Sequence, residues 1–82
     1  MSSKPLTPPE REILETAAIA GGRFTISGLW ETEMLRLATT VVELKRRGLV
    51  KSRIRFSSEI PGQPEAIPIE LTPEGERALG RI

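Results

Sequence analysis

Apolar residues recur at helical spacing in the first quarter of the chain. The first stripe consists of Ile13, Leu14, Ala17 and Ala18. Such a stripe is typical of a helix that packs one face on a core. Thr7 and Glu10 are spaced as a capping box with proline at the first helical position, and Gly21-Gly22 forms a stop signal. The pattern predicts a helix over residues 8–20.

A second apolar stripe lies in the middle of the chain. It consists of Met34, Leu37, Val41 and Leu44. These residues fall within one narrow arc at 3.6 residues per turn, which predicts a helix over residues 33–47. Thr32 is the expected cap at its start, and Gly48 ends it.

The segment between these helices is short. Residues 23–25 are expected to form a connecting strand, and Ser27 can cap a short second helix that holds Leu29 and Trp30. We expect Trp30, the only tryptophan, in the core, because it follows Leu29 in that short helix.

After Gly48 the apolar period changes to two, which predicts a β-hairpin. One strand face holds Val50, Ile54 and Phe56, with Lys51, Arg53 and Arg55 opposite; Ser52 also falls on the apolar face. A proline- and glycine-containing loop over 57–65 leads to a second strand with Ile67, Ile69 and Leu71. If Ile54 lies opposite Ile69, Arg53 lies opposite Glu70 and pairs with it.

Two further expectations concern the end of the hairpin and the core. Pro68 should have its nitrogen facing outward, since it cannot donate to a strand partner. Thr72 caps a last short helix. The residues expected to face inward are Ile13, Leu14, Leu37, Val41, Leu44, Leu49, Ile54, Phe56, Ile69 and Leu71.

Composition narrows the function classes. The chain has 82 residues, which favours one domain over 1–82, with residues 1–6 as a flexible arm. It contains no cysteine and no histidine, and every acidic residue is a glutamate. Thiol nucleophiles, a Ser-His-Asp triad and zinc sites built on Cys or His are therefore excluded, and we expect no enzyme, metal or cofactor. No apolar run is long enough to span a bilayer and no apolar signal core opens the chain, so a cytoplasmic protein without membrane contact is expected.

The net charge of +1 hides an uneven distribution. Residues 23–55 carry +5, whereas residues 1–22 carry −1 and residues 56–82 carry −3. A basic middle between acidic ends predicts one electropositive face.

Two motifs resemble a known group of proteins. Leu44-Lys45-Arg46-Arg47-Gly48-Leu49-Val50 is similar to the "LxxxGLV" that ends the recognition helix in MarR- and PadR-type regulators, and residues 70–79, ELTPEGERAL, resemble their "LTxxGxxxL". The resemblance implies an α+β winged helix-turn-helix with a three-helix core, a β-hairpin wing and a short C-terminal helix. It also implies a transcriptional regulator that binds double-stranded DNA, with the helix at 33–47 in the major groove. A homodimer would let two such helices reach paired half-sites.

The candidate DNA-binding residues lie on the outward side of that helix and on the basic strand. They are Arg36, Thr39, Thr40, Glu43, Arg46, Arg47, Lys51, Arg53 and Arg55. Arg36 could read guanine edges, Thr39 could touch a thymine methyl group or a phosphate, and Glu43 could accept from a cytosine amino group. Arg46 and the strand cations could hold phosphates. The basic residues 45–47 have a second interpretation as charges that favour a helix C-terminus.

A different class of function also fits the sequence. The expected wing tip, 57–66, contains Glu59 and Glu65 and no Lys or Arg, and the outward helix face includes Leu35 and Val42. An acidic wing and apolar outward residues are typical of a protein-binding surface. The alternative is therefore a winged-helix interaction module or a subunit of a larger assembly that does not bind DNA.

Overall fold

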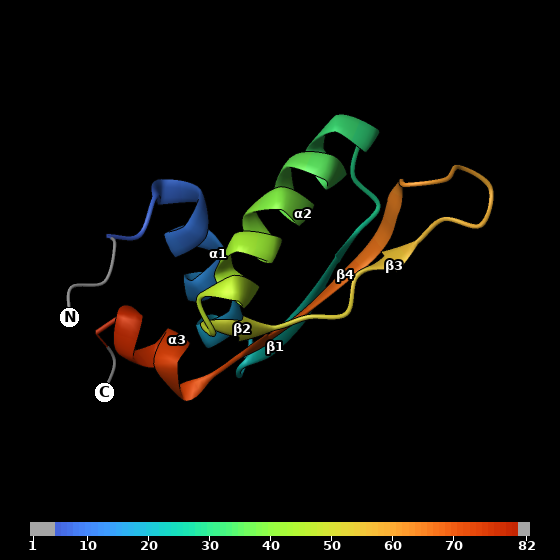
Figure 1. Ribbon diagram of the computed structural model, residues 1–82. Coiled ribbons are helices and arrows are strands. Elements are labelled where there is room, and N and C mark those ends of the chain that lie inside the picture. Colours follow the sequence, from blue (N-terminus) through green and yellow to red (C-terminus); the bar gives the residue numbers. More distant parts are fainter. Residues whose placement is uncertain (1–4, 81–82) are drawn as a thin grey trace.

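A computed structural model describes residues 5–80 as an α+β domain with three helices and one antiparallel sheet (Figure 1). The elements are α1 (Pro8–Ile19), β1 (Arg23–Ser27), α2 (Glu31–Arg46), β2 (Val50–Lys51), β3 (Arg55–Phe56), β4 (Pro64–Leu71) and α3 (Pro73–Ala78). Residues 1–4 of the expected flexible arm at 1–6 lie outside the described residues. Leu6, at the end of that arm, packs against the core. Within 5–80, no helix is long and apolar enough to cross a membrane.

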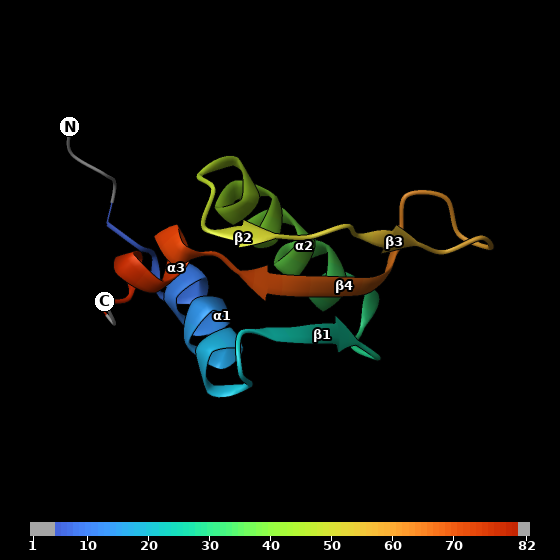
Figure 2. The ribbon, with the colours of Figure 1, turned by 90° about the horizontal axis from the view of Figure 1, so that it is seen from below.

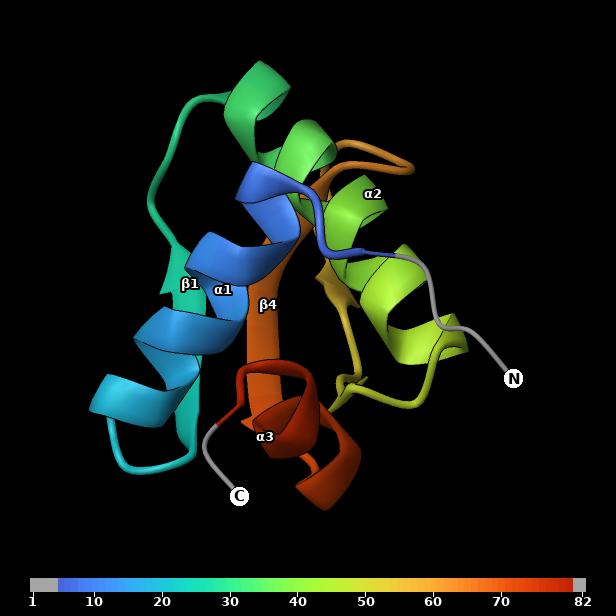
Figure 3. The same cartoon turned by 90° about the vertical axis from the view of Figure 1, so that its left-hand side faces the viewer.

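The sheet has the strand order β1-β4-β2, and β3 also pairs with β4. Phe24 lies opposite Ile69 and Ile26 opposite Ile67, so these four side chains share one face. Helices α1 and α2 cover that face (Figure 3). Figure 2 looks onto the other face, where the strands lie in front of α2. The domain is therefore a two-layer structure with one sheet face open.

The core confirms most of the predicted inward residues. Ile13, Leu14, Val41, Leu44, Leu49 and Ile69 are buried, and Leu37, Ile54 and Leu71 pack against them while partly buried. Phe56 is the exception. Its side chain is 57% exposed, at the point where a register shift between Arg55 and Phe56 ends the regular alternation of the strand.

The predicted second helix is wrong. The alternation of Phe24 and Ile26 continues the first strand through Ser27, where β4 provides the pairing partner. Gly28, with φ +76°, then turns the chain directly into α2. Trp30 is consequently 84% exposed rather than in the core. It is also the N-cap of α2, which begins before the expected cap Thr32 and has no side-chain capping bond.

The first hairpin strand is interrupted where it passes Pro68. Lys51 pairs with Glu70 and Arg55 with Ala66, and the same register puts Arg53 opposite Pro68. Proline has no N–H to donate, so the pairing breaks between β2 and β3. The expected pairs Ile54–Ile69 and Arg53–Glu70 are therefore wrong, and the Pro68 nitrogen faces this break.

Ser52 lies in the same interruption. Its inward position was expected from the sequence, and its hydroxyl oxygen is buried without a hydrogen-bond partner among residues 5–80. A buried hydroxyl without a partner costs about 1–3 kcal/mol. The strand segment 52–54 is therefore less firmly held than its two ends.

Helix caps fix how the helices meet the sheet. The Thr7–Glu10 capping box forms as predicted. After α2, Gly48 has φ +76° and Leu49 N–H donates to the Leu44 carbonyl at 3.0 Å, which closes the helix in a Schellman-type turn. Thr72 accepts from Gly75 N–H at 3.0 Å and donates to the Gly48 carbonyl at 2.7 Å. The start of α3 is thereby tied to the end of α2.

Gly75 explains the glycine of the second motif. It is buried in α3, where a Cβ atom would collide with the backbone carbonyl of Leu49. Only glycine allows α3 to approach the turn after α2 this closely.

Candidate nucleic-acid interface

The outward face of α2 presents the predicted helix residues to solvent. Arg36 pairs with Glu33 at 2.6 Å and Arg46 pairs with Glu43 at 3.3 Å. Both arginine side chains remain mostly exposed. Each pair joins residues three apart on a helix surface, where such an ion pair contributes about 0–1 kcal/mol. A stronger anion could therefore displace the glutamate at low cost.

The two predicted threonines use their hydroxyl groups within the helix. Thr39 and Thr40 hydroxyls donate to the helix carbonyls of Leu35 and Arg36, at 3.0 and 3.2 Å. This back-bonding occupies the hydroxyl protons. Thr39 is exposed and Thr40 only partly so. Thr39 therefore offers mainly its methyl group to a partner.

Arg47 is more buried than the other predicted cations. Its guanidinium contacts Glu10 on α1 at 3.3 Å, and the two side chains are 18% and 8% exposed. This ion pair joins the start of α1 to the end of α2. Arg47 is therefore directed toward the interior and we leave it out of the interface.

The remaining cations lie along the strand that follows α2. Lys51, Arg53 and Arg55 alternate onto the open face of the sheet and are exposed. Together with Lys45 near the end of α2, they form no ion pair with any described residue. We call these four residues the cationic strip. Unpaired surface cations of this kind are available for phosphate oxygens.

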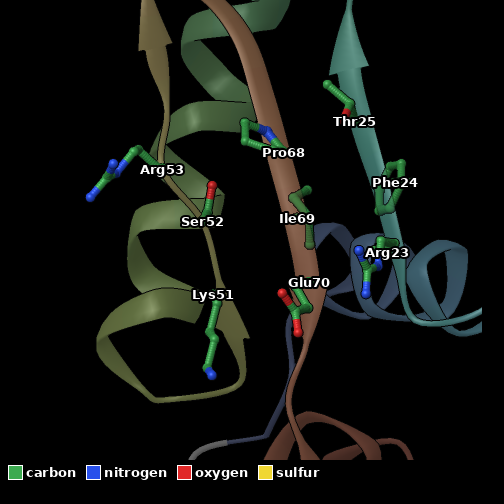
Figure 4. Close-up of a pocket in the computed structure, with 9 residues that line it drawn as sticks. All are labelled: Arg23, Phe24, Thr25, Lys51, Ser52, Arg53, Pro68, Ile69 and Glu70. Carbon is green, nitrogen blue, oxygen red and sulfur yellow. The ribbon is translucent and has the colours of Figure 1, made fainter.

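Arg53 lies at the border between two grooves. One groove, of about 280 Å³, runs between α2 and the strand and is lined by Val41, Val42, Lys45, Ser52, Arg53, Ile54 and Phe56. The other, of about 440 Å³, lies on the open sheet face and includes Arg23, Lys51, Arg53 and Glu70 (Figure 4). We call the first the helix–strand groove. It has an apolar floor and cations on its rim.

Glu70 moderates the charge on the open sheet face. It lies between Arg23 on β1 and Lys51 on β2 in the strand register. Both neighbours are cations, so the sheet face keeps a net positive charge around one carboxylate. The charge excess predicted for residues 23–55 is therefore concentrated on one side of the sheet and beside α2.

Sequence reasoning omitted Lys45 and Arg23 from the candidate site. Lys45 was assigned only to the helix C-terminus, although its position one turn after Val42 would have placed it near the outward face. Arg23 could not be found, because its position beside Glu70 depends on the pairing of β1 with β4.

The site is built from cations and apolar side chains. The chain has no histidine, cysteine or aspartate, and within residues 5–80 no three acidic groups gather in a way that could hold a metal ion. The cationic strip offers charge and hydrogen-bond donors, and the helix–strand groove offers apolar contact. No family model, curated protein or solved structure matches the chain.

Proposed function

We propose that this protein binds double-stranded DNA as a winged-helix domain and acts as a transcriptional regulator. The observation that carries the proposal is the cationic strip, Lys45, Lys51, Arg53 and Arg55, which lies beside the outward face of α2 and forms no ion pair within residues 5–80. In the proposed complex, α2 enters the major groove and the strip holds the adjacent phosphates.

The order of elements supports a winged-helix arrangement. Helix α1, strand β1, helix α2 and the hairpin of β2, β3 and β4 follow one another, and β1 closes the sheet against β4. The turn at 28–30 replaces the middle helix of a helix-turn-helix. The proposed recognition unit is therefore α2 with its hairpin, without a supporting helix in front of it.

The charge distribution specifies which part of the hairpin faces DNA. Glu59 is exposed at the tip and Glu65 is exposed at the start of β4, whereas the cations follow the strand from Lys51 near the base to Arg55, opposite Ala66. Carboxylates are repelled by phosphates, so the tip stays away from the backbone. We therefore propose that the segment 50–56, rather than the wing tip, binds the phosphate backbone of DNA.

Replacing Arg53 by alanine is expected to weaken binding to all duplexes alike. Arg53 can reach only the backbone, so its loss should flatten the dependence of log affinity on log salt by roughly 0.9 for the one phosphate contact removed. The measurement is a fluorescence-anisotropy titration on specific and random duplexes at several salt concentrations.

Arg77→Ala is the matched control for Arg53→Ala. It removes the same charge from α3, where Arg77 pairs with Glu74 at 3.4 Å, away from the helix–strand groove. Equal salt slopes for the wild type, Arg53→Ala and Arg77→Ala would contradict the proposed interface.

Arg36→Ala is expected to act on sequence discrimination. Arg36 is exposed on the second turn of α2, and a bidentate contact to guanine contributes about 1–3 kcal/mol of discrimination. The ratio of specific to random affinity should therefore fall while the salt slope stays close to that of the wild type. The specific duplex is first selected from a random library with the wild-type protein. An unchanged ratio would show that Arg36 does not contact a base and only forms its solvent-exposed ion pair with Glu33.

A protein-binding function is favoured by a different observation. Val42 and Phe56 are exposed apolar side chains on the two walls of the helix–strand groove, and Leu35 is exposed on the same helix. Such a groove could take an apolar side chain of a partner. Absence of DNA binding by the wild type at low salt would support this function over DNA binding.

A further inference from the structure

Strand β1 has a free edge. It lies at one end of the sheet order, and in Figures 2 and 3 only the end of α1 and the turn that follows it extend past the start of β1. Leu71 N–H donates to the Gly22 carbonyl at 2.7 Å. This bond determines which residues of β1 direct their backbone groups toward β4. By antiparallel alternation, Phe24 and Ile26 direct their backbone groups to β4, and Arg23, Thr25 and Ser27 direct theirs outward.

This edge lacks the features that usually keep a strand from pairing with another chain. Such features are proline, a bulge, or charged residues, lysine above all, in the strand. Strand β1 pairs with β4 in unbroken register over five residues and contains no proline. Of the three residues whose backbone groups point outward, Thr25 and Ser27 have small side chains. The third, Arg23, is the only charged residue of the strand and lies at its start.

We infer that β1 pairs with β1 of a second copy of this chain, antiparallel and centred on Thr25. In this register Thr25 faces Thr25 of the other copy, and Arg23 faces Ser27. Every backbone group that β1 directs outward then finds a partner, because the three outward-directed residues are placed symmetrically about Thr25. A two-fold axis through Thr25 produces this arrangement from one surface.

The side chains agree with this register. On the open face Arg23 meets Ser27, so no two like charges lie directly opposite. On the helix-covered face Phe24 meets Ile26, and both are only partly buried in the single chain. Two exposed aliphatic residues flank the strand in sequence: Ile19, which is 85% exposed, and Leu29. An apolar groove, lined in part by Phe24, Ile26 and Leu29, continues the contact surface.

The paired form joins two sheets into one. Because the axis is perpendicular to the sheet, the helices of both copies lie on the same side. The strands 50–56 remain at the two outer edges, so the cationic strip is not covered. The inference is therefore independent of the proposed DNA binding.

Thr25→Pro tests the pairing. Its N–H points away from β4, so proline removes an outward donor and leaves the internal pairing intact. Sedimentation should show a concentration-dependent dimer for the wild type and for Thr25→Val, and a monomer for Thr25→Pro. Circular dichroism checks that Thr25→Pro remains folded. Thr25→Lys is a second disruptive variant, because it keeps the backbone N–H but puts two like charges opposite each other in the dimer. A wild type that stays monomeric at millimolar concentration, or dimers unaffected by both substitutions, would overturn the inference.

A single introduced cysteine tests the register directly, since the chain has none of its own. Facing residues in a hydrogen-bonded antiparallel pair have Cα atoms about 5.5 Å apart, within the range of roughly 4.4–6.8 Å that a disulfide needs. Thr25→Cys should give a covalent dimer under mild oxidation much faster than Ser58→Cys, which is exposed in the hairpin loop. Equal rates for the two variants would overturn the proposed register.

Discussion

Replacing Glu10 by alanine is expected to lower the free energy of unfolding by about 3–5 kcal/mol. Its carboxylate is buried, accepts from Thr7 N–H at 2.9 Å and contacts the Arg47 guanidinium at 3.3 Å. The substitution removes the reciprocal half of the capping box and the carboxylate that contacts the mostly buried Arg47 guanidinium. Urea denaturation followed by circular dichroism measures the loss.

Two variants separate the causes of this loss. Glu12→Ala removes an exposed carboxylate from the same turn of α1 and should change stability by no more than about 0.5 kcal/mol. Glu10→Gln keeps an oxygen for Thr7 and removes only the charge, so its loss should lie between the other two. A loss below about 1 kcal/mol for Glu10→Ala would show that the ion pair with Arg47 does not tie α1 to α2.

Leu44→Ala is expected to cost about 2–5 kcal/mol of stability, the range for a fully buried leucine whose removal leaves a cavity. Leu44 has no exposed surface and belongs to the central cluster with Leu14 and Ile67. Its carbonyl also accepts from Leu49 N–H, so the residue lies where α2 turns into the hairpin. The same denaturation experiment measures the effect.

Leu35→Ala is the control on the same helix. Leu35 is 46% exposed on the outward face of α2, so its truncation should cost much less than that of Leu44. Similar losses for the two variants would mean that the inward and outward faces of α2 are assigned incorrectly.

The two proposals separate cleanly in experiment. DNA binding depends on the cationic strip at one edge of the sheet, and self-association depends on β1 at the other. Arg53→Ala should leave the dimer intact, and Thr25→Pro should leave the salt slope per chain unchanged. If both proposals hold, the dimer would bring two α2 helices to one duplex and strengthen binding by raising their effective concentration.

Much of the local structure was determined by the sequence alone. The Thr7–Glu10 capping box, the helix over residues 8–20 and the end of α2 at Gly48 follow from interactions within a few residues. The alternation after Gly48 and the cap at Thr72 predicted the hairpin and α3 in the same way. Local hydrogen bonds and a single period of burial are enough to specify such elements.

Part of the candidate site was also accessible from the sequence. Arg36 and Arg46 lie on the outward side of α2, as the helical period required, and Lys51, Arg53 and Arg55 alternate to one face. Their partners were not accessible. Arg53 faces Pro68 rather than Glu70, and Arg47 contacts Glu10, which is 37 residues away in the chain.

Only the tertiary structure decided the features that depend on pairing between distant segments. Strand β4 extended β1 through Ser27 and so replaced the predicted helix, which left Trp30 in solvent. Pro68 broke the ladder between β2 and β3, and a separate register shift between Arg55 and Phe56 accompanies the exposure of Phe56. The physical reason is that a strand's register follows from backbone bonds and packing with its partner strand, whereas the periodicity of one segment records only which of its own residues share a face.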